Sequence, residues 1–167
     1  MSNGASAVRR HFYLKDLITG SEIRAHGMPE SYTDSKSANW VSTGILLRSS
    51  PLMGYKDSEP RTVSFSFNFH AGVEQSDSTT PADVKRCVDF LLSLAYPDYS
   101  GGIKPPHLCF LSLGGQVRMK CVLRSVTATY SAPYDVNTGL AHHAKVSIVA
   151  IEVDDIPKSY EQVRGGG

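Results

Sequence analysis

Residues 61–71 constrain the fold more than any other part of this sequence. Large apolar residues alternate here with small polar ones, so one face of an extended strand carries Val63, Phe65, Phe67 and Phe69. The other face carries Thr62, Ser64, Ser66 and Asn68. Strict alternation is typical of an antiparallel sheet that buries one face and leaves the other polar. The pattern therefore predicts a sheet protein with a large core on one side of this strand.

Further strands are predicted on both sides of this one. A hairpin is expected over residues 10–25, and a strand at 107–113 continues through the turn Gly114-Gly115 into a long strand at 116–130. The apolar positions of that long strand change parity near Arg124 and Ser125, which predicts a bulge. The last strand is expected over residues 141–153 and is apolar on both faces in its second half, which indicates a central or covered position.

One helix is predicted between these groups of strands. Thr80 is a good N-cap, Pro81 suits the first helical position, and apolar residues then recur every three or four positions until Pro97. Strands and helices do not alternate along the chain, so a parallel sheet is not expected. The sequence predicts a mainly β (α+β) fold, an antiparallel β barrel or sandwich with one packed α-helix.

Residues 27–60 differ from the rest of the chain. They are rich in Gly, Pro, Ser and Asp, and we expect an extended loop with little regular structure that is either mobile or ordered by a partner. Tyr32, Trp40 and Tyr55 lie in this segment, as does the short apolar run Ile45-Leu46-Leu47. Aromatic residues in such a loop either pack on the chain's own sheet or anchor a partner protein.

The domain organisation expected from these patterns is simple. Residues 1–9 form a disordered N-terminal arm, residues 10–157 form one β domain that includes the loop 27–60, and residues 158–167 form a flexible tail. The N-terminus lacks the apolar stretch of a secretory signal, and no apolar run reaches the ~18 residues of a membrane helix. We therefore expect no membrane insertion.

Composition and motifs argue against several functions. The net charge is +1, which is too small for a protein that binds polyanions. No phosphate-binding loop or nucleophile elbow is present, and the adjacent residues His142 and His143 would point to opposite faces of a strand. His107 and Cys109 alternate with leucines, which favours a core face over a catalytic pair. We predict no catalytic, cofactor-binding or metal-binding residues, three buried thiols, and a structural assembly subunit that is not an enzyme.

The order of these segments resembles the tail-tube-like proteins of contractile phage tails and contractile injection systems. Met28-Pro29-Glu30-Ser31-Tyr32 resembles the family's Asn-Pro-Glu-x-Tyr segment, and the strand at 61–71 resembles its most typical strand. Lys104-Pro105-Pro106, followed by Phe110 and Gly114, resembles its hairpin of paired prolines, an aromatic residue and a turn glycine. The likeness runs from about residue 12 to 153. Met28 replaces the family's Asn, and no peptidoglycan-binding LysM module follows Pro157, so cell-wall binding is not carried over.

This resemblance implies a homo-hexameric ring around a channel, with strands of neighbouring subunits joined edge to edge. The leading hypothesis is a tube initiator or adaptor at the baseplate end of the virion's tail, made in the host cytoplasm. Its partners would be the tail tube, the baseplate hub and wedge or sheath proteins, with DNA only as cargo and with no cofactor. The alternatives are the main tail tube protein and, from another class, a small-ligand-binding β barrel. The candidate interface residues are Tyr32, Trp40, Ile45, Leu46, Tyr55, Val149 and Ile151.

Overall fold

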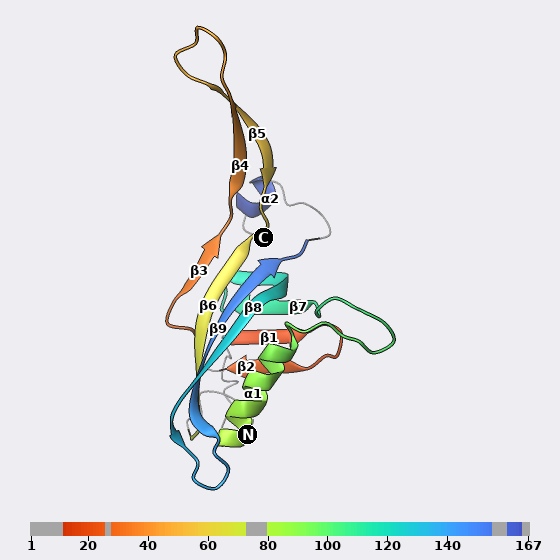
Figure 1. Cartoon of the computed structure of the whole chain (residues 1–167), viewed down its shortest axis with the longest axis vertical. Coiled ribbons are helices and arrows are strands. Elements are labelled where there is room, and N and C mark those ends of the chain that lie inside the picture. Colours follow the sequence, from red (N-terminus) through yellow and green to blue (C-terminus); the bar gives the residue numbers. More distant parts are fainter. Residues whose placement is uncertain (1–11, 26–27, 73–79, 155–159, 165–167) are drawn as a thin grey trace, which may run out of the picture.

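The computed structural model describes residues 12–25, 28–72, 80–154 and 160–164. Within these ranges the chain folds into strands and two helices, with one hairpin that projects far from the body (Figure 1). The strands are β1 (Phe12–Asp16), β2 (Glu22–Ala25), β3 (Tyr32–Ser35), β4 (Ala38–Thr43), β5 (Leu52–Ser58), β6 (Thr62–His70), β7 (Cys109–Leu113), β8 (Val117–Tyr134) and β9 (Ala141–Glu152). The helices are α1 (Pro81–Ser93) and α2 (Tyr160–Arg164).

Seven of the strands form one antiparallel sheet in the order β2-β1-β7-β8-β9-β6-β3, and β4 and β5 form a separate pair. The prediction of a mainly β, antiparallel fold with one packed helix is confirmed. β1, β2 and β7 run across the direction of β6 and β9, so the sheet bends into two layers (Figure 1). β8 belongs to both layers, because it pairs first with β7 and then with β9. Its register shifts between Leu123 and Ser125, which confirms the predicted bulge.

The barrel is the part of the fold prediction that needs correction, because the sheet stays open. Phe12 of β1 stacks on Phe67 of β6 with 4.9 Å between ring centroids, so the two layers face each other across the core. Closure would require the outer strands β2 and β3 to pair, and they do not. β3 covers only the first four residues of β6, and the chain then leaves the sheet to form the hairpin. The two layers therefore meet through core side chains such as Phe12 and Phe67, without backbone pairing between β2 and β3.

Helix α1 begins at the predicted N-cap. The Thr80 hydroxyl accepts a hydrogen bond from the Asp83 amide at 3.2 Å, and the Asp83 carboxylate accepts one from the Thr80 amide at 3.1 Å. This capping box satisfies two amides of the first turn. The helix lies against β9, β8 and β6 and closes one side of the core (Figure 1). Its buried residues are Val84, Cys87, Val88 and Leu91.

The alternation of β6 decides which face of the sheet is buried. Val63, Phe65, Phe67 and Phe69 are all at most 6% exposed, as the sequence predicts. They meet the buried residues of β9, which are Ala144, Val146, Ile148 and Ala150. All three cysteines are buried and none is in a disulfide, which confirms their prediction as core thiols.

The segment at 27–60 is where the sequence prediction was wrong. It contains three strands, β3, β4 and β5, in place of a loop with little regular structure. The serines and glycines suggested a loop because they favour turns. Backbone pairing between β4 and β5 nonetheless forms a regular ladder, interrupted only by a register shift beside Trp40. The segment is therefore an antiparallel ribbon that continues the β3–β6 pair outward.

The two ends of the chain are described only in part. Tyr160–Arg164, within the expected flexible tail, forms the short helix α2. The expected disordered arm at residues 1–9 and the last three glycines lie outside the described residues. In the part of the chain that the structure describes, neither helix is long and apolar enough to span a bilayer.

Candidate assembly interface

The hairpin β4–β5 exposes apolar side chains on both of its faces. Trp40 lies opposite Tyr55 in the ladder, and their rings make an edge contact with 5.6 Å between centroids. Both rings remain more than half exposed, at 57% and 58%. The opposite face carries Val41 and Leu52, which are also about half exposed. An isolated two-stranded ribbon has no core of its own, so surface of this kind is typical of a site that another chain covers.

The tip of the hairpin is more exposed still. Ile45 is 45% exposed, Leu46 is 91% exposed, and Leu47 is fully open to solvent. Leu47 also has a φ of 66°, which a leucine rarely adopts because its Cβ crowds the backbone. Three consecutive apolar residues at the end of a projecting arm are costly in water and useful only in contact with something else. The tip is the strongest candidate for a contact site in the described chain.

An ion pair fixes the base of the hairpin to the sheet. The Arg61 Nε donates to Asp34 Oδ1 at 2.8 Å, Arg61 also contacts Asp34 Oδ2, and Glu152 of β9 lies 4.0 Å from the guanidinium. The hydrogen bond from Arg61 lowers the pKa of Asp34, although partial burial opposes the shift. Glu59 donates its amide to the Ser37 carbonyl at 2.9 Å, which bridges the gap between the β3–β6 and β4–β5 ladders. The arm is therefore attached to the body on both of its strands.

The other predicted interface residues lie elsewhere. Tyr32 is in β3, packs half-buried against the core, and its hydroxyl is hydrogen-bonded to the Gln116 side chain. Val149 and Ile151 lie on the outer face of β9, opposite to α1, and are partly buried. The structure thus brings together Trp40, Tyr55 and the two tip residues Ile45 and Leu46 on one arm. Tyr32 and the β9 residues belong to the sheet itself.

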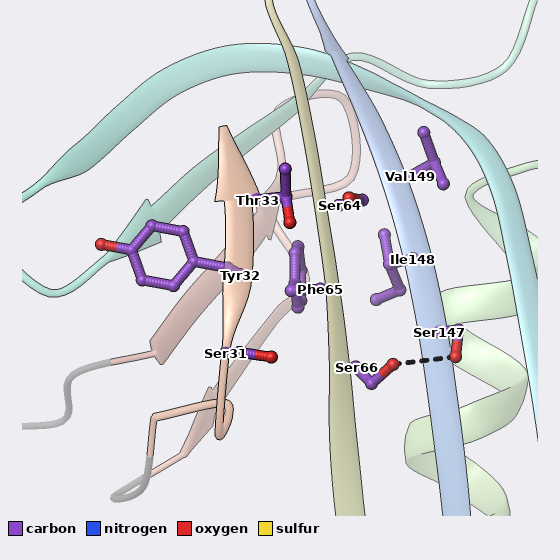
Figure 2. Close-up of a pocket in the computed structure, with 9 residues that line it drawn as sticks. All are labelled: Ser31, Tyr32, Thr33, Ser64, Phe65, Ser66, Ser147, Ile148 and Val149. Atoms are coloured by element: carbon purple, nitrogen blue, oxygen red, sulfur yellow. Dashed lines mark hydrogen bonds between the residues drawn. The ribbon is translucent and has the colours of Figure 1, made fainter. Parts of the chain in front are cut away.

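The outer face of β6, β9 and β8 is rich in hydroxyl groups. In this face Ser66 and Ser147 approach each other with 2.9 Å between their Oγ atoms (Figure 2). A shallow hollow of about 220 Å³ lies here, bordered by β3. Figure 2 shows its residues, which are Ser31, Tyr32, Thr33, Ser64, Phe65, Ser66, Ser147, Ile148 and Val149. Farther along the same face β8 contributes Ser125, Thr127, Thr129 and Ser131.

This part of the sheet has an open edge on each side. β7 covers β8 only as far as Cys121, so no described strand pairs with the outer side of residues 122–134. β3 covers β6 only from Thr62 to Phe65, so residues 66–70 likewise lack a described strand neighbour on that side. Open edges present unpaired amides and carbonyls, which readily pair with another strand. The three-stranded unit β6-β9-β8 can therefore accept a neighbour at both sides.

His107 lies against Asp16 of β1, and Cys109 is buried in β7. His107 Nδ1 lies 2.8 Å from Asp16 Oδ2, and Asp16 also accepts from the Ile18 amide and the Thr19 hydroxyl. Burial alone would raise the pKa of Asp16, but these hydrogen bonds outweigh it and lower the pKa below 3.8. Burial raises the pKa of the Cys109 thiol to about 12, which makes it a poor nucleophile. No cluster of three metal-binding side chains occurs among the described residues.

A comparison with known protein families fits the exposed surfaces and open strand edges described above. The family model for the contractile injection system tube protein matches residues 16–149. The chain belongs to that family. The match includes the hairpin, α1 and the strands from β2 to most of β9, and the resemblance seen in the sequence is therefore confirmed. No curated protein matched the chain. Membership of a tube family indicates a structural component of a contractile tail or injection system that assembles with other tail components, and implies a non-enzymatic role.

Sequence reasoning missed part of the exposed apolar surface. Leu52 and Met53 of β5 extend the hairpin surface and are 51% and 56% exposed. A second group lies on the opposite flank, in the β1–β2 turn and the loop after α1. Apolar residues beside Gly, Pro and Asp in predicted turns were the available signal, because such residues cannot reach a core from a short turn.

Proposed function

We propose that this tube-family protein forms a hexameric ring at the baseplate end of the tail and joins the tube to the baseplate hub. One observation carries the proposal: the unit β6-β9-β8 has an open edge on each side. Pairing of residues 66–70 of one copy with part of residues 122–134 of the next would cover the shorter open edge and part of the longer one. Repetition of that heterologous contact would close a ring through the β6-β9-β8 units.

In such a ring the hydroxyl-rich face of β6, β9 and β8 would line the channel. The opposite face is the core side that α1 covers, so the helix would lie on the outside. Val149 and Ile151, on the outer face of the middle strand β9, would then be part of the channel wall. Serine and threonine hydroxyls would keep the wall hydrated, and the exposed Lys145 would add a positive charge to the same face.

The hairpin would provide a second kind of contact. Its exposed residues Trp40, Ile45, Leu46 and Tyr55 form an arm that extends beyond the sheet (Figure 1). An arm of this length reaches past the subunit that carries it, so it suits contact with another copy, the hub, or wedge and sheath proteins. Tyr32, at the start of β3, would instead lie beside the open edge of β6, where it pairs with Phe65.

Two alternatives remain distinct from this proposal. The main tube protein would use the same ring but would stack many copies, which requires complementary upper and lower faces. A small-ligand-binding protein would need an enclosed apolar cavity of ~300–1,000 Å³. The hollow beside Ser66 is smaller and open, and six of its nine lining residues carry a hydroxyl group. The core side of the sheet is filled by phenylalanines. These features disfavour a ligand-binding role.

The deciding experiment is electron microscopy of the purified protein with and without its hub partner, together with light scattering. The proposal expects single rings, formed alone or on the hub. Long open-ended stacks would favour the main tube protein. A strict monomer that neither assembles nor binds the hub would overturn both.

A further inference from the structure

Two histidines from neighbouring strands stack on each other at one end of the sheet. His70 is the last residue of β6, and it lies directly opposite His143 of β9 in the ladder. Their imidazole rings are 4.1 Å apart between centroids, and the ring planes differ by 24°. The pair lies at the end of β6 that is remote from the projecting hairpin (Figure 1). Two imidazoles held side by side in this way can bind one cation together.

Strand pairing brings together histidines that the sequence separates. His142 and His143 are adjacent in β9 and point to opposite faces of the strand, so they cannot bind one ion as a pair. The antiparallel register gives His143 a different partner, His70, on the same face. Both of these residues alternate with buried core residues, Phe69 and Ala144, so both rings project from the polar face of the sheet.

The surroundings keep this pair in the form that binds metal ions. A histidine binds a cation through an unprotonated ring nitrogen, so a proton on that nitrogen competes with the metal. Burial lowers the pKa of His70 below its ordinary 6.5, and the charge of a protonated His143 lowers it further. The His70 ring is therefore largely neutral at pH 7. The same face carries Asn68 of β6, Lys145 of β9 and Ser131 of β8 around the pair.

The nitrogen ligands and their spacing select the kind of cation. Two nitrogens that bind one tetrahedral Zn²⁺ at ~2.0–2.1 Å lie about 3.3 Å from each other. Rings with centroids 4.1 Å apart reach this spacing through a small tilt about the side-chain bonds. Imidazole suits Zn²⁺, Ni²⁺ and Cu²⁺, whereas Mg²⁺ and Ca²⁺ prefer oxygen ligands. A divalent transition-metal cation therefore fits the pair better than the alkaline-earth cations do.

We propose that His70 and His143 form a binding site for a divalent transition-metal cation such as Zn²⁺, with water at the remaining coordination positions. The cation would join the end of β6 to the start of β9 on the polar face of the sheet. Binding would stabilise the folded chain, because the unfolded chain does not hold the two rings together. Both ligands belong to one chain, so zinc binding and the proposed ring formation can fail independently.

Calorimetric titration of the full chain, without an affinity tag, with ZnCl₂ tests the site. At about pH 7.5, where histidine is mostly neutral, we expect one Zn²⁺ to bind per chain. Binding should weaken at least about tenfold in His70→Ala and in His143→Ala, since the remaining imidazole lacks a second ligand at high effective concentration. Zn²⁺ should also raise the melting temperature of the native chain and not that of either variant.

His142→Ala is the matched control, because it removes an adjacent imidazole from the opposite face of β9. This variant should bind Zn²⁺ as the native chain does. The proposal would be overturned by a native chain that does not bind Zn²⁺. Equal affinities in all three variants, or a loss in His142→Ala as large as that in His70→Ala, would likewise place the cation elsewhere.

Chemical modification of the native chain gives a second measurement that does not depend on the folding of a variant. Diethyl pyrocarbonate modifies unprotonated histidine rings, and peptide mass spectrometry measures the rate at each position. Bound Zn²⁺ should slow the modification of His70 and His143 and leave the rate at His142 unchanged. Equal rates with and without Zn²⁺ at His70 and His143 would reject the site.

Discussion

Strand β6 and the hairpin β4–β5 adjoin in the sequence but have opposite relations to water. β6 alternates, buries every second side chain and keeps its polar face outward. The hairpin does not alternate in this way, and nearly all of its residues are exposed, including an aromatic pair and several aliphatic side chains. The core of the chain covers one face of β6, whereas the side chains of the arm stay largely exposed.

The difference separates two tasks that one chain must perform. Burial in β6 stabilises the single subunit, because the transfer of those rings out of water occurs on folding. The exposed apolar side chains of the hairpin would leave water only when another chain binds, so their burial would stabilise the assembly and not the single subunit. Substitutions in the two regions should therefore act on different measurements, the free energy of unfolding for the body and the degree of assembly for the arm.

The largest effect on folding is expected from Phe69→Ala. Phe69 is fully buried and packs against Phe67 with 5.1 Å between ring centroids. Loss of the ring leaves a cavity and should lower the free energy of unfolding by about 3–5 kcal/mol. Urea denaturation of the purified subunit measures this loss in the free energy of unfolding. Leu46→Ala is the control at the tip, and a similar loss there would contradict the contrast between the two regions.

Asp16→Ala should have the next largest effect. The change leaves the Ile18 amide, the Thr19 hydroxyl and His107 without their shared acceptor, at a cost of about 1–3 kcal/mol. Asp135→Ala is a matched control, since Asp135 accepts from the amides of a similar turn but lies nearer to solvent. Denaturation curves that rank Asp135→Ala as more damaging would reject the burial argument.

The same carboxylate predicts a dependence of stability on acid. The pKa of Asp16 is lower in the folded chain than its ordinary 3.8, so its contribution is complete above that value. As the pH falls below about 4, the unfolded chain takes up the proton first and stability declines. Thermal melting between pH 6 and pH 3 should show a steeper decline for the native chain than for Asp16→Ala. Parallel curves would contradict this.

Arg61→Ala should have a smaller effect, localised at the base of the arm. The pair with Asp34 is partly exposed, with 27% and 33% of the side chains open, so the expected loss is about 0.5–1 kcal/mol. Hydrogen exchange should accelerate in β3 and less in β9. Lys85→Ala removes the more exposed pair with Asp89 on α1 and serves as the control. Unchanged exchange in β3 would mean that the ladder alone holds the arm.

The smallest effect on folding is expected from Leu46→Asp, together with the largest effect on assembly. Leu46 is 91% exposed, so stability should change by less than about 0.5 kcal/mol. A charge at the tip must be desolvated on contact, so rings or stacks should be lost in light scattering. Leu46→Met is the conservative control and should retain assembly. Normal assembly of Leu46→Asp would remove the tip from the interface.

The body of the fold was predictable because local patterns agreed with the final packing. The alternation in β6, the capping residues Thr80 and Asp83, and the parity change in β8 each specify an element without reference to a distant residue. Local sequence patterns were therefore sufficient to predict the elements that bury a single face against the core.

The hairpin and the open sheet were harder to predict for a physical reason. Pairing in β4–β5 depends on backbone groups, which leave little trace in a sequence of serines, glycines and scattered apolar residues. The question of barrel closure depends on whether β2 meets β3, a contact between distant segments. Trp40, Ile45, Leu46 and Tyr55 are exposed on one arm, and their role in an interface stays a prediction. The exposed surface extends to Leu52 and Met53, and the exposed apolar side chains of the β1–β2 turn and of the loop after α1 were not predicted.

The continuity of β8 has a mechanical consequence. One strand runs through both layers, bonded to β7 at its start and to β9 along the rest of its length. Antiparallel hydrogen bonds lie perpendicular to the strands, so a pull along β8 loads many of them together in shear. Rupture in that direction requires simultaneous failure of the whole ladder, whereas peeling would break one bond at a time. A subunit of a device that moves under force is therefore strongest along the axis of β8.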